Sequence, residues 1–290
     1  MRYCLALVSL LVFLGSTVAV SPDLAAQQPA SPRVGTPQLP RFSPPINQWL
    51  VYRHIIKRPA GATAMTSTIS RCVRFTPIGR GYRFDTRVVD VTDTGPAPLL
   101  EMLHIGSAIK RDEALVLDLG ASGEIIGVYD LNATWERLVA AAKRLRSTLD
   151  QQVASSMARM AGAQLLDTII TMPMGERASY FASAVRPILG LADAIMADSK
   201  WIYPATGETA LPIVANGDIA RFAIGPPPSP ALDSYVASQS EGTLEIGADG
   251  LLYSVERTIR VSAMGTERVN RDIWERIDDP VEVQRFCTLD

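Results

Sequence analysis

The stretch that decides the fold is WLVYRHIIKRPAGATAMTSTISRCVRFTPIGRGYRFDTRVVDV, residues 49–91. Apolar and polar side chains alternate along it, with Met65, Ile69 and Val73 in one phase and mostly polar residues in the other. A period of two is that of a strand with one buried face. Pro, Gly and Arg clusters interrupt the pattern twice and suit hairpin turns. We therefore expect three strands, over residues 49–57, 64–75 and 82–91.

Alternation returns in the last third of the chain. Asn216-Gly217 and Asp249-Gly250 are strong hairpin signals, and Tyr253, Val255 and Ile259 share the apolar phase of a long strand. The pattern predicts strands over 211–215, 219–224, 243–246, 251–262 and 268–277. Two shorter strands are expected over 114–118 and 124–129.

Between the two strand sets the apolar period changes to 3.6. A stripe of apolar residues from Trp135 to Ala163 follows Asp130 and Asn132, either of which suits a helix N-cap. This pattern predicts one long helix, or two with a bend, ended by Pro173. A second apolar helix is expected from Glu176 to about Met196, interrupted or kinked at Pro187.

Strands over 47–130, helices over 131–200 and strands over 201–280 predict an α+β fold. We expect the two strand sets to form one antiparallel, curved sheet that packs on the central helical pair. Residues 47–290 are interpreted as one domain, and two smaller domains are the alternative. The order of elements is similar to that of exported lipid-carrier half-barrels of the bacterial envelope, and the similarity extends to no sequence motif.

The first residues have the order of a secretory signal peptide. Arg2 precedes an apolar run from Leu5 to Leu14, and small residues follow. Residues 1–26 are assigned to this signal, with cleavage after Ala19 or after Ala26. An uncleaved membrane anchor is the alternative. Six prolines in residues 27–46 predict an extended leader. We therefore expect a secreted or periplasmic protein that has no transmembrane segment once the signal is removed.

Removal of the signal peptide also removes Cys4, which leaves Cys72 and Cys287. Thiols pair in the oxidising compartments that exported proteins enter, so we expect a structural disulfide between these two residues. Two buried free thiols are the alternative.

Charge and histidine content exclude several functional classes. The formal net charge is −2, with the two signs interspersed, which argues against a nucleic acid or an anionic membrane as the principal partner. The two histidines, His54 and His104, have no partner at metal-ligand spacing. No nucleotide or cofactor motif occurs, so neither a metal nor a cofactor is expected.

Two short motifs are candidates for catalysis. Asp93-Thr94-Gly95 matches the tripeptide of aspartic proteases, in which two carboxylates share a proton and activate water. Ser107-Ala108-Ile109-Lys110 matches the S-x-x-K motif of penicillin-recognising serine enzymes, whose other two motifs are absent. An ordinary turn and an ordinary helix start, respectively, explain the same residues.

Three functions are compatible with these features. The first is noncatalytic binding of a lipid, another apolar molecule or an envelope partner, with candidate ligand-binding residues on the second helix: Tyr180, Phe181, Ile188, Leu189 and Met196. The second is an exported hydrolase that uses carboxylates such as Asp93. The third is a structural or adaptor protein of the envelope.

Overall fold

The computed structural model describes residues 40–60, 63–111, 113–192, 194–197, 200–203, 208–216, 218–226, 236–263 and 266–287. The expected signal peptide, Cys4 and most of the Pro-rich leader lie outside the described residues. Across the described residues, twelve strands form one antiparallel sheet that is not closed, accompanied by five α-helices and a short 3-10 helix. The expectation of an α+β fold with a mostly antiparallel sheet is therefore confirmed.

The sheet order is β5-β4-β3-β2-β1-β12-β11-β10-β9-β8-β7-β6. Strands consecutive in sequence are neighbours, except β5 and β6, which lie at the two edges of the sheet. Pairing of β1 with β12 joins the N- and C-terminal strand sets. The strands are β1 (Trp49–Ala60), β2 (Thr63–Ile78), β3 (Gly81–Thr94), β4 (Ala114–Leu119), β5 (Ile125–Val128), β6 (Ile195–Ala197), β7 (Lys200–Ile202), β8 (Thr209–Asn216), β9 (Ile219–Gly225), β10 (Val236–Gly247), β11 (Leu252–Ala263) and β12 (Thr266–Ile277).

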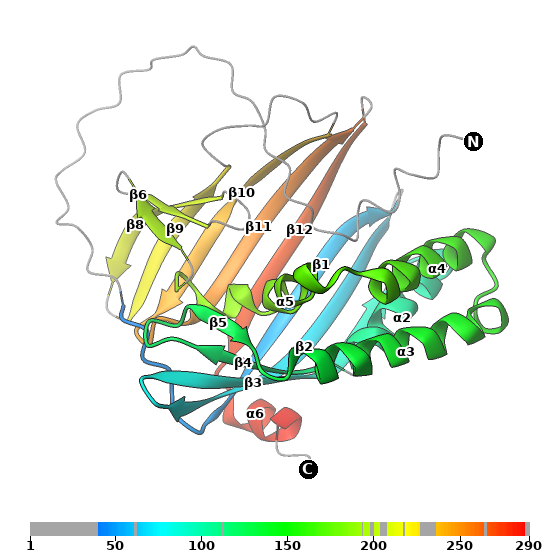
Figure 1. Cartoon of the computed structure of the whole chain (residues 1–290). Coiled ribbons are helices and arrows are strands. Elements are labelled where there is room, and N and C mark those ends of the chain that lie inside the picture. The colour runs from blue at the N-terminus through cyan, green and yellow to red at the C-terminus, as the bar shows by residue number, and fades with distance from the viewer. Residues whose placement is uncertain are drawn as a thin grey trace.

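Most helices lie on one face of the sheet, which we call the inner face. They are α2 (Ala97–Arg111), α3 (Leu131–Gln152), α4 (Ser156–Thr171), α5 (Met174–Ser183) and the 3-10 helix η1 (Arg186–Leu189). Helix α2 packs on β3, α4 packs on α2 and α3, and η1 packs on β11. Figure 1 shows α2 to α5 grouped beside the blue and cyan strands, with α6 (Pro280–Cys287) on the opposite side of the sheet.

The main core lies between the inner face and the helices. Buried aromatic and aliphatic side chains from both strand sets meet helix residues there: Tyr52, Val73, Phe75, Phe84, Phe222, Leu244, Val255, Trp135, Leu138, Phe181, Ile188 and Leu189 are among them. Each strand contributes alternate residues, as the period of two predicts. Burial of this apolar surface is the main term that holds the helices on the sheet.

The opposite, outer face is covered by α6 over β1 to β3. Val51, Cys72 and Cys287 form a second buried cluster beneath that helix. The structure joins Cys72 to Cys287 by a disulfide, with the Sγ atoms 2.01 Å and the Cα atoms 5.7 Å apart. The last helix is thereby fixed to a central strand of the sheet.

The helical region differs from the sequence expectation at three places. The long apolar stripe forms two antiparallel helices, because Ser155 begins α4 as an N-cap whose side chain accepts a hydrogen bond from the backbone N–H of Ala158. Asp130 precedes α3 but makes no side-chain cap hydrogen bond. The helix expected to reach Met196 ends at Ser183 instead. Pro187 and Gly190, which has φ +61°, prevent its continuation.

Two helices were not predicted from the sequence. The segment containing His104 belongs to α2, in which Ile105 and Ile109 lie one turn apart and are buried. The C-terminal tail forms α6, which Pro280 begins and the carboxylate of Asp279 supports by accepting a hydrogen bond from the backbone N–H of Val281. Proline in the first turn and a preceding aspartate are ordinary helix-start signals.

Candidate functional site

An ionic cluster lies on the inner face of β1, β11 and β12. Arg257 donates from Nη1 to Glu208 Oε2 and from Nη2 to Asp272 Oδ2, each over 2.8 Å. These three side chains are only 11–14% exposed. His54 Nε2 lies 2.5 Å from the other carboxylate oxygen of Asp272, and the imidazole stacks on Trp274 with ring centroids 4.0 Å apart.

Strand register brings this cluster together. Asp272 lies opposite Arg257 on β11 and opposite Ile56 on β1, while His54 lies opposite Trp274. Because side chains alternate between faces, all of these residues share the inner face with the core. The cluster therefore forms a polar region on the face of the sheet that otherwise carries the apolar core.

Burial and pairing shift the pKa values of the cluster in opposite directions. Burial raises the pKa of the Asp272 carboxyl, but hydrogen bonding to His54 and the charge of Arg257 outweigh it and lower the pKa to about 2. Burial lowers the pKa of His54 more than Asp272 raises it. Asp272 is thus held ionised and His54 neutral at neutral pH.

A second ionic group lies where α2 meets β2 and β3. Arg71 Nη2 donates to Glu113 Oε1 over 2.9 Å, and the two side chains are 5% and 10% exposed. Its Nη1 donates to Thr86 Oγ1 over 3.2 Å. Nearby, Ser107 Oγ donates to Asp93 Oδ2 over 2.5 Å. The two short motifs of the sequence, at 93–95 and 107–110, are therefore in contact.

Two basic side chains at this junction differ from the other charged side chains of the two ionic groups in having no direct partner. Arg58 on β1 and Lys110 at the end of α2 are half-buried, and neither has an ion pair or hydrogen bond from its side chain to another described residue. Burial lowers the pKa of both groups. The carboxylates of Glu113 and Asp93 oppose this effect on the pKa of Lys110, and that of Asp272 opposes it on the pKa of Arg58.

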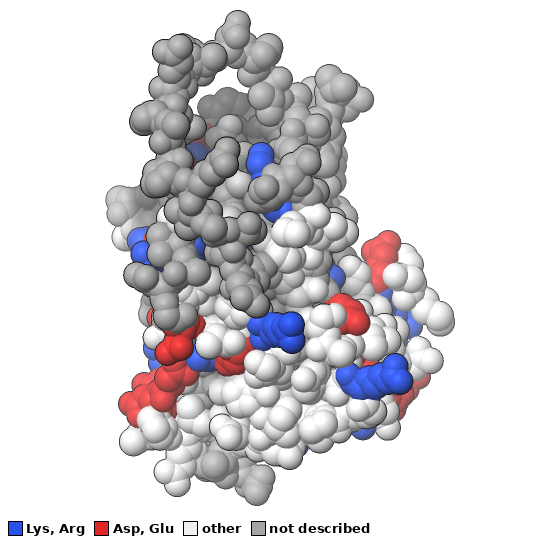
Figure 2. Space-filling model, turned by 90° about the vertical axis from the view of Figure 1, so that its left-hand side faces the viewer, with Lys and Arg blue, Asp and Glu red and all other residues white. Residues whose placement is uncertain are grey.

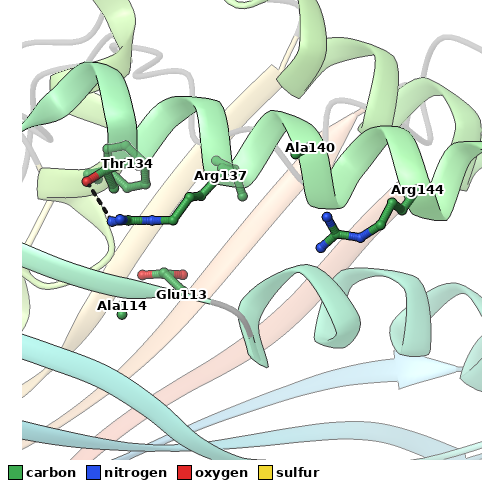
Figure 3. A pocket seen from close by; sticks show the side chains of 8 residues that line it. Glu113, Ala114, Thr134, Arg137, Ala140 and Arg144 are labelled. Carbon is green, nitrogen blue, oxygen red and sulfur yellow. Dashed lines mark hydrogen bonds between the residues drawn. The ribbon is translucent and has the colours of Figure 1, made fainter.

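A cavity of about 310 Å³ opens between α3 and the beginning of β4. Figure 3 shows Arg137 and Arg144 extending from α3 toward this space, with the Glu113 carboxylate below Arg137. Apolar side chains complete the lining: Ala114, Leu138, Ala140 and Phe181. The volume is at the small end of those typical of ligand sites.

The predicted ligand-binding residues are dispersed. Phe181 lines the cavity, and Tyr180 packs on Trp135 with ring centroids 5.8 Å apart. Ile188 and Leu189 are fully buried in the main core. Met196 lies in the edge strand β6 with 63% of its surface exposed. Of this set, only Phe181 contributes to the described cavity.

The candidate catalytic residues have no catalytic arrangement in the described part of the chain. Asp93 is hydrogen bonded to Ser107, and none of the described carboxylates is hydrogen bonded to it. Ser107 is 5% exposed. His104 is exposed on α2. Within the described residues, no group of three or more histidine, cysteine or acidic side chains could hold a metal ion.

Sequence reasoning missed Arg257, Asp272 and Arg71, although a signal was present. Arg257 lies in the apolar phase of its strand, two residues from Val255 and from Ile259. Asp272 shares a phase with Trp274, and Arg71 shares one with Val73. A charged residue in a buried phase needs a partner on the same face, and each of these residues has one.

Surface charge gives no further direction. On the face shown in Figure 2, basic and acidic residues lie scattered among wide uncharged areas of the described surface.

None of the described helices is long and apolar enough to cross a membrane.

Comparisons with known proteins give no relative for this chain. It matches no known family, and no curated protein shows significant similarity to its sequence.

Proposed function

We propose that this protein is an exported, noncatalytic binding protein whose ligand is a small amphipathic acid. The ligand occupies the cavity between α3 and β4, with its acidic group at Arg137 and Arg144 and its apolar part on Phe181 and Leu138. The observation that carries the proposal is the composition of this cavity, in which two arginines face an apolar wall.

The charge of the cavity favours an anion. Glu113, its one acidic lining residue, is paired with Arg71 on the side of the sheet. Arg137 donates to the hydroxyl of Thr134 over 3.2 Å, which leaves its charge unneutralised by that bond. Arg137 and Arg144 are seven residues apart on α3, close to two helical turns, and so lie on one face. Guanidinium groups bind carboxylates and phosphates through paired hydrogen bonds.

The apolar wall favours a hydrocarbon or aromatic group over a fully polar ligand. Phe181 is 1% exposed and Leu138 is 9% exposed, so both are held firmly in the core and each presents only a small part of its side chain to the cavity. Burial of apolar area contributes about 25 cal/mol per Å² to binding before the cost of immobilising the ligand. The proposal thus narrows the expected lipid or other apolar molecule to an amphipathic acid.

The proposal includes two further features: the protein is exported, and its sheet is curved. The sequence of the first residues supports delivery to an oxidising compartment, and the Cys72–Cys287 disulfide is compatible with it. In the proposal, the sheet curves around the helices, and α3 and α5 border the cavity. Binding of an envelope protein at the same place is the alternative within this class.

Native mass spectrometry of the secreted protein with dodecanoate tests the proposal. We expect a one-to-one adduct, with affinity reduced at least about tenfold in the double variant Arg137→Ala/Arg144→Ala, because a lost charge-assisted hydrogen bond costs about 1.5–3 kcal/mol. Lys143→Ala is the matched control, since Lys143 is exposed on α3 and does not line the cavity. Equal adduct formation by the double variant, or by dodecyltrimethylammonium, would contradict the proposal.

A hydrolase is the second candidate, and one contact favours it. Ser107 and Asp93, from the two catalytic-type motifs, share a hydrogen bond of 2.5 Å. Near-complete burial of Ser107 opposes a role as nucleophile. Turnover of ester or peptide substrates that Ser107→Ala abolishes would replace the binding proposal. Neither ligand uptake nor turnover would leave the structural or adaptor role.

A further inference from the structure

The open sheet has two edge strands, β5 and β6. An edge strand presents backbone N–H and C=O groups that can pair with another chain, and proteins protect such edges with bulges or covering helices. The β5 edge has both: Ile126 is a bulge residue with no partner on β4, and α5 packs against the strand. By contrast, the three residue pairs described between β6 and β7 follow one another without a bulge.

Strand β6 exposes large apolar side chains on both of its faces. Ile195 is 61% exposed and Met196 is 63% exposed. Met196 lies opposite Trp201 on β7, whose side chain packs on the main core, so Met196 belongs to the inner face. Ile195, the residue before it, belongs to the outer face. Both side chains thus extend the apolar surface to the edge of the sheet, where water meets it.

The apolar surface continues on the outer face of β8. Leu211 follows Ala210, which lies opposite Trp201, so Leu211 shares the outer face with Ile195. Ile213 lies two residues further, at a bulge in the pairing with β9. Figure 1 places β6 and β8 on the left-hand side of the molecule, and Figure 2, which looks at that side, shows wide uncharged areas among the described residues.

The exposed apolar area is close to what one half of a dimer interface requires. Ile195, Met196, Leu211 and Ile213 are 39–63% exposed. At these fractions, four side chains of this size expose on the order of 400 Å². A standard interface buries about 800 Å² on each partner, of which somewhat more than half is apolar. The edge therefore supplies most of the apolar area that a stable dimer needs.

A second copy of this chain fits the edge better than an extended peptide. Strand β6 has only three residues, Ile195–Ala197, so it offers few main-chain hydrogen bonds to an added strand. A flexible peptide would also lose conformational entropy on binding. A folded copy instead brings an equal apolar area on a rigid sheet. Repulsion between copies is small, because the formal net charge is only −2.

We propose that two copies of this chain form a two-fold symmetric dimer through antiparallel pairing of their β6 strands. The two-fold axis passes beside Met196, the middle residue of the strand, so Met196 lies opposite its counterpart in the second copy. The two sheets become continuous, and Ile195 and Leu211 of both copies cover one side of the junction. Such a contact buries the same surface on each copy. It uses none of the residues of the α3–β4 cavity, so it goes beyond the proposed function.

Sedimentation velocity of the full secreted chain over two decades of concentration tests the dimer. We expect a monomer–dimer equilibrium with Kd of about 10 μM or tighter. Met196→Lys should weaken it at least about 100-fold, because two like charges then lie opposite each other across the axis. Met160→Lys is the matched control, since Met160 is 53% exposed on α4, outside the edge. Thermal unfolding should show both variants folded, because both side chains are exposed.

Cross-linking tests the register and does not depend on the lysine variant. Directly opposed residues of an antiparallel pair have Cα atoms about 4.5–5.5 Å apart, which is within the range of a disulfide. Met196→Cys should therefore give a covalent dimer on mild oxidation, and Met160→Cys should not. A dimer that Met196→Cys fails to cross-link would place the interface elsewhere and overturn the proposal.

Two further outcomes would overturn it. A wild type that stays monomeric at every concentration would mean that the β6 edge binds a different partner or none. Equal dimerisation of the wild type and Met196→Lys would show that the copies associate through another surface. Arg137→Ala/Arg144→Ala should dimerise like the wild type, so failure of the cavity proposal and failure of this one are distinguishable.

Discussion

The two faces of the sheet carry the same kinds of ion pair in opposite surroundings. On the inner face, Arg257, Asp272 and Glu208 are bonded to one another with 11–14% of each side chain exposed. On the outer face of the same strands, Arg271 and Glu256 are bonded with 50% and 46% exposed. Alternate residues of β11 and β12 therefore belong to a buried network and to a solvated one.

The difference shows that position, not residue type, decides what an ion pair does. An exposed ion pair adds little to the stability of the fold, because each ion is already well solvated by water before it meets its partner. In the interior, the attraction is stronger, but so is the penalty for leaving either partner alone. The inner-face network is therefore a place where single substitutions are costly.

The largest effect is expected from Asp272→Ala. This change leaves Arg257 with one of its two acceptors and removes the partner of His54. We expect a loss of about 3–5 kcal/mol in the free energy of unfolding, measured by urea denaturation. Glu267→Ala is the matched control, since Glu267 is exposed on the same strand. Similar losses for the two variants would remove the distinction between the faces.

The disulfide provides a second test of the comparison between the two faces, because it lies on the outer face, where α6 covers β1 to β3. The bond joins residues 215 apart in the chain, so its removal frees a long segment of the unfolded chain. We expect Cys72→Ala/Cys287→Ala to lower the free energy of unfolding by about 2–4 kcal/mol. Loss of the contacts made by α6, such as that of Arg53 with Glu282, should accompany it.

Reductant provides the control for the disulfide variant. It should destabilise the wild type by a similar amount and leave the double alanine variant unchanged, as measured by urea denaturation with and without the reductant. An unchanged wild type would contradict a stabilising role of the bond.

Acid should weaken the inner face selectively. The pKa of Asp272 is about 2 in the folded protein, against 3.8 for an unperturbed side chain. A depressed carboxyl pKa contributes stability above the unfolded value and loses it as pH falls toward the folded value. We expect about 2 kcal/mol to be lost between pH 5 and pH 2 through this residue. Asp272→Asn should have a correspondingly flatter acid limb in urea denaturation; an equal slope in both proteins would count against it.

Much of the fold was predictable because strand alternation and hairpin turns are local signals. The strands around Met65 and around Val255 lie where the period of two places them. Pairing of β1 with β12 connects residues more than 200 apart, and no local signal specifies it. Helix α2 was missed since Gly106 interrupts its apolar pattern.

The candidate sites were harder to predict than the fold. A cavity arises from side chains of α3, α5 and β4 that meet only after folding. The charged residues of the inner face were visible as exceptions in an apolar phase, but the register that brings each of them to its partner was not. The register depends on the whole sheet and not on any one segment.

The smallest effect is expected for the outer-face pair Arg271 and Glu256. A double-mutant cycle with alanine at both positions should give a coupling energy of about 0.2–1 kcal/mol, which decreases as salt is added. The same cycle on Arg257 and Asp272 should give a larger coupling energy that is nearly independent of salt, because solvent ions do not reach that pair. Equal salt dependence of the two cycles would mean that the helices do not exclude water from the inner-face cluster.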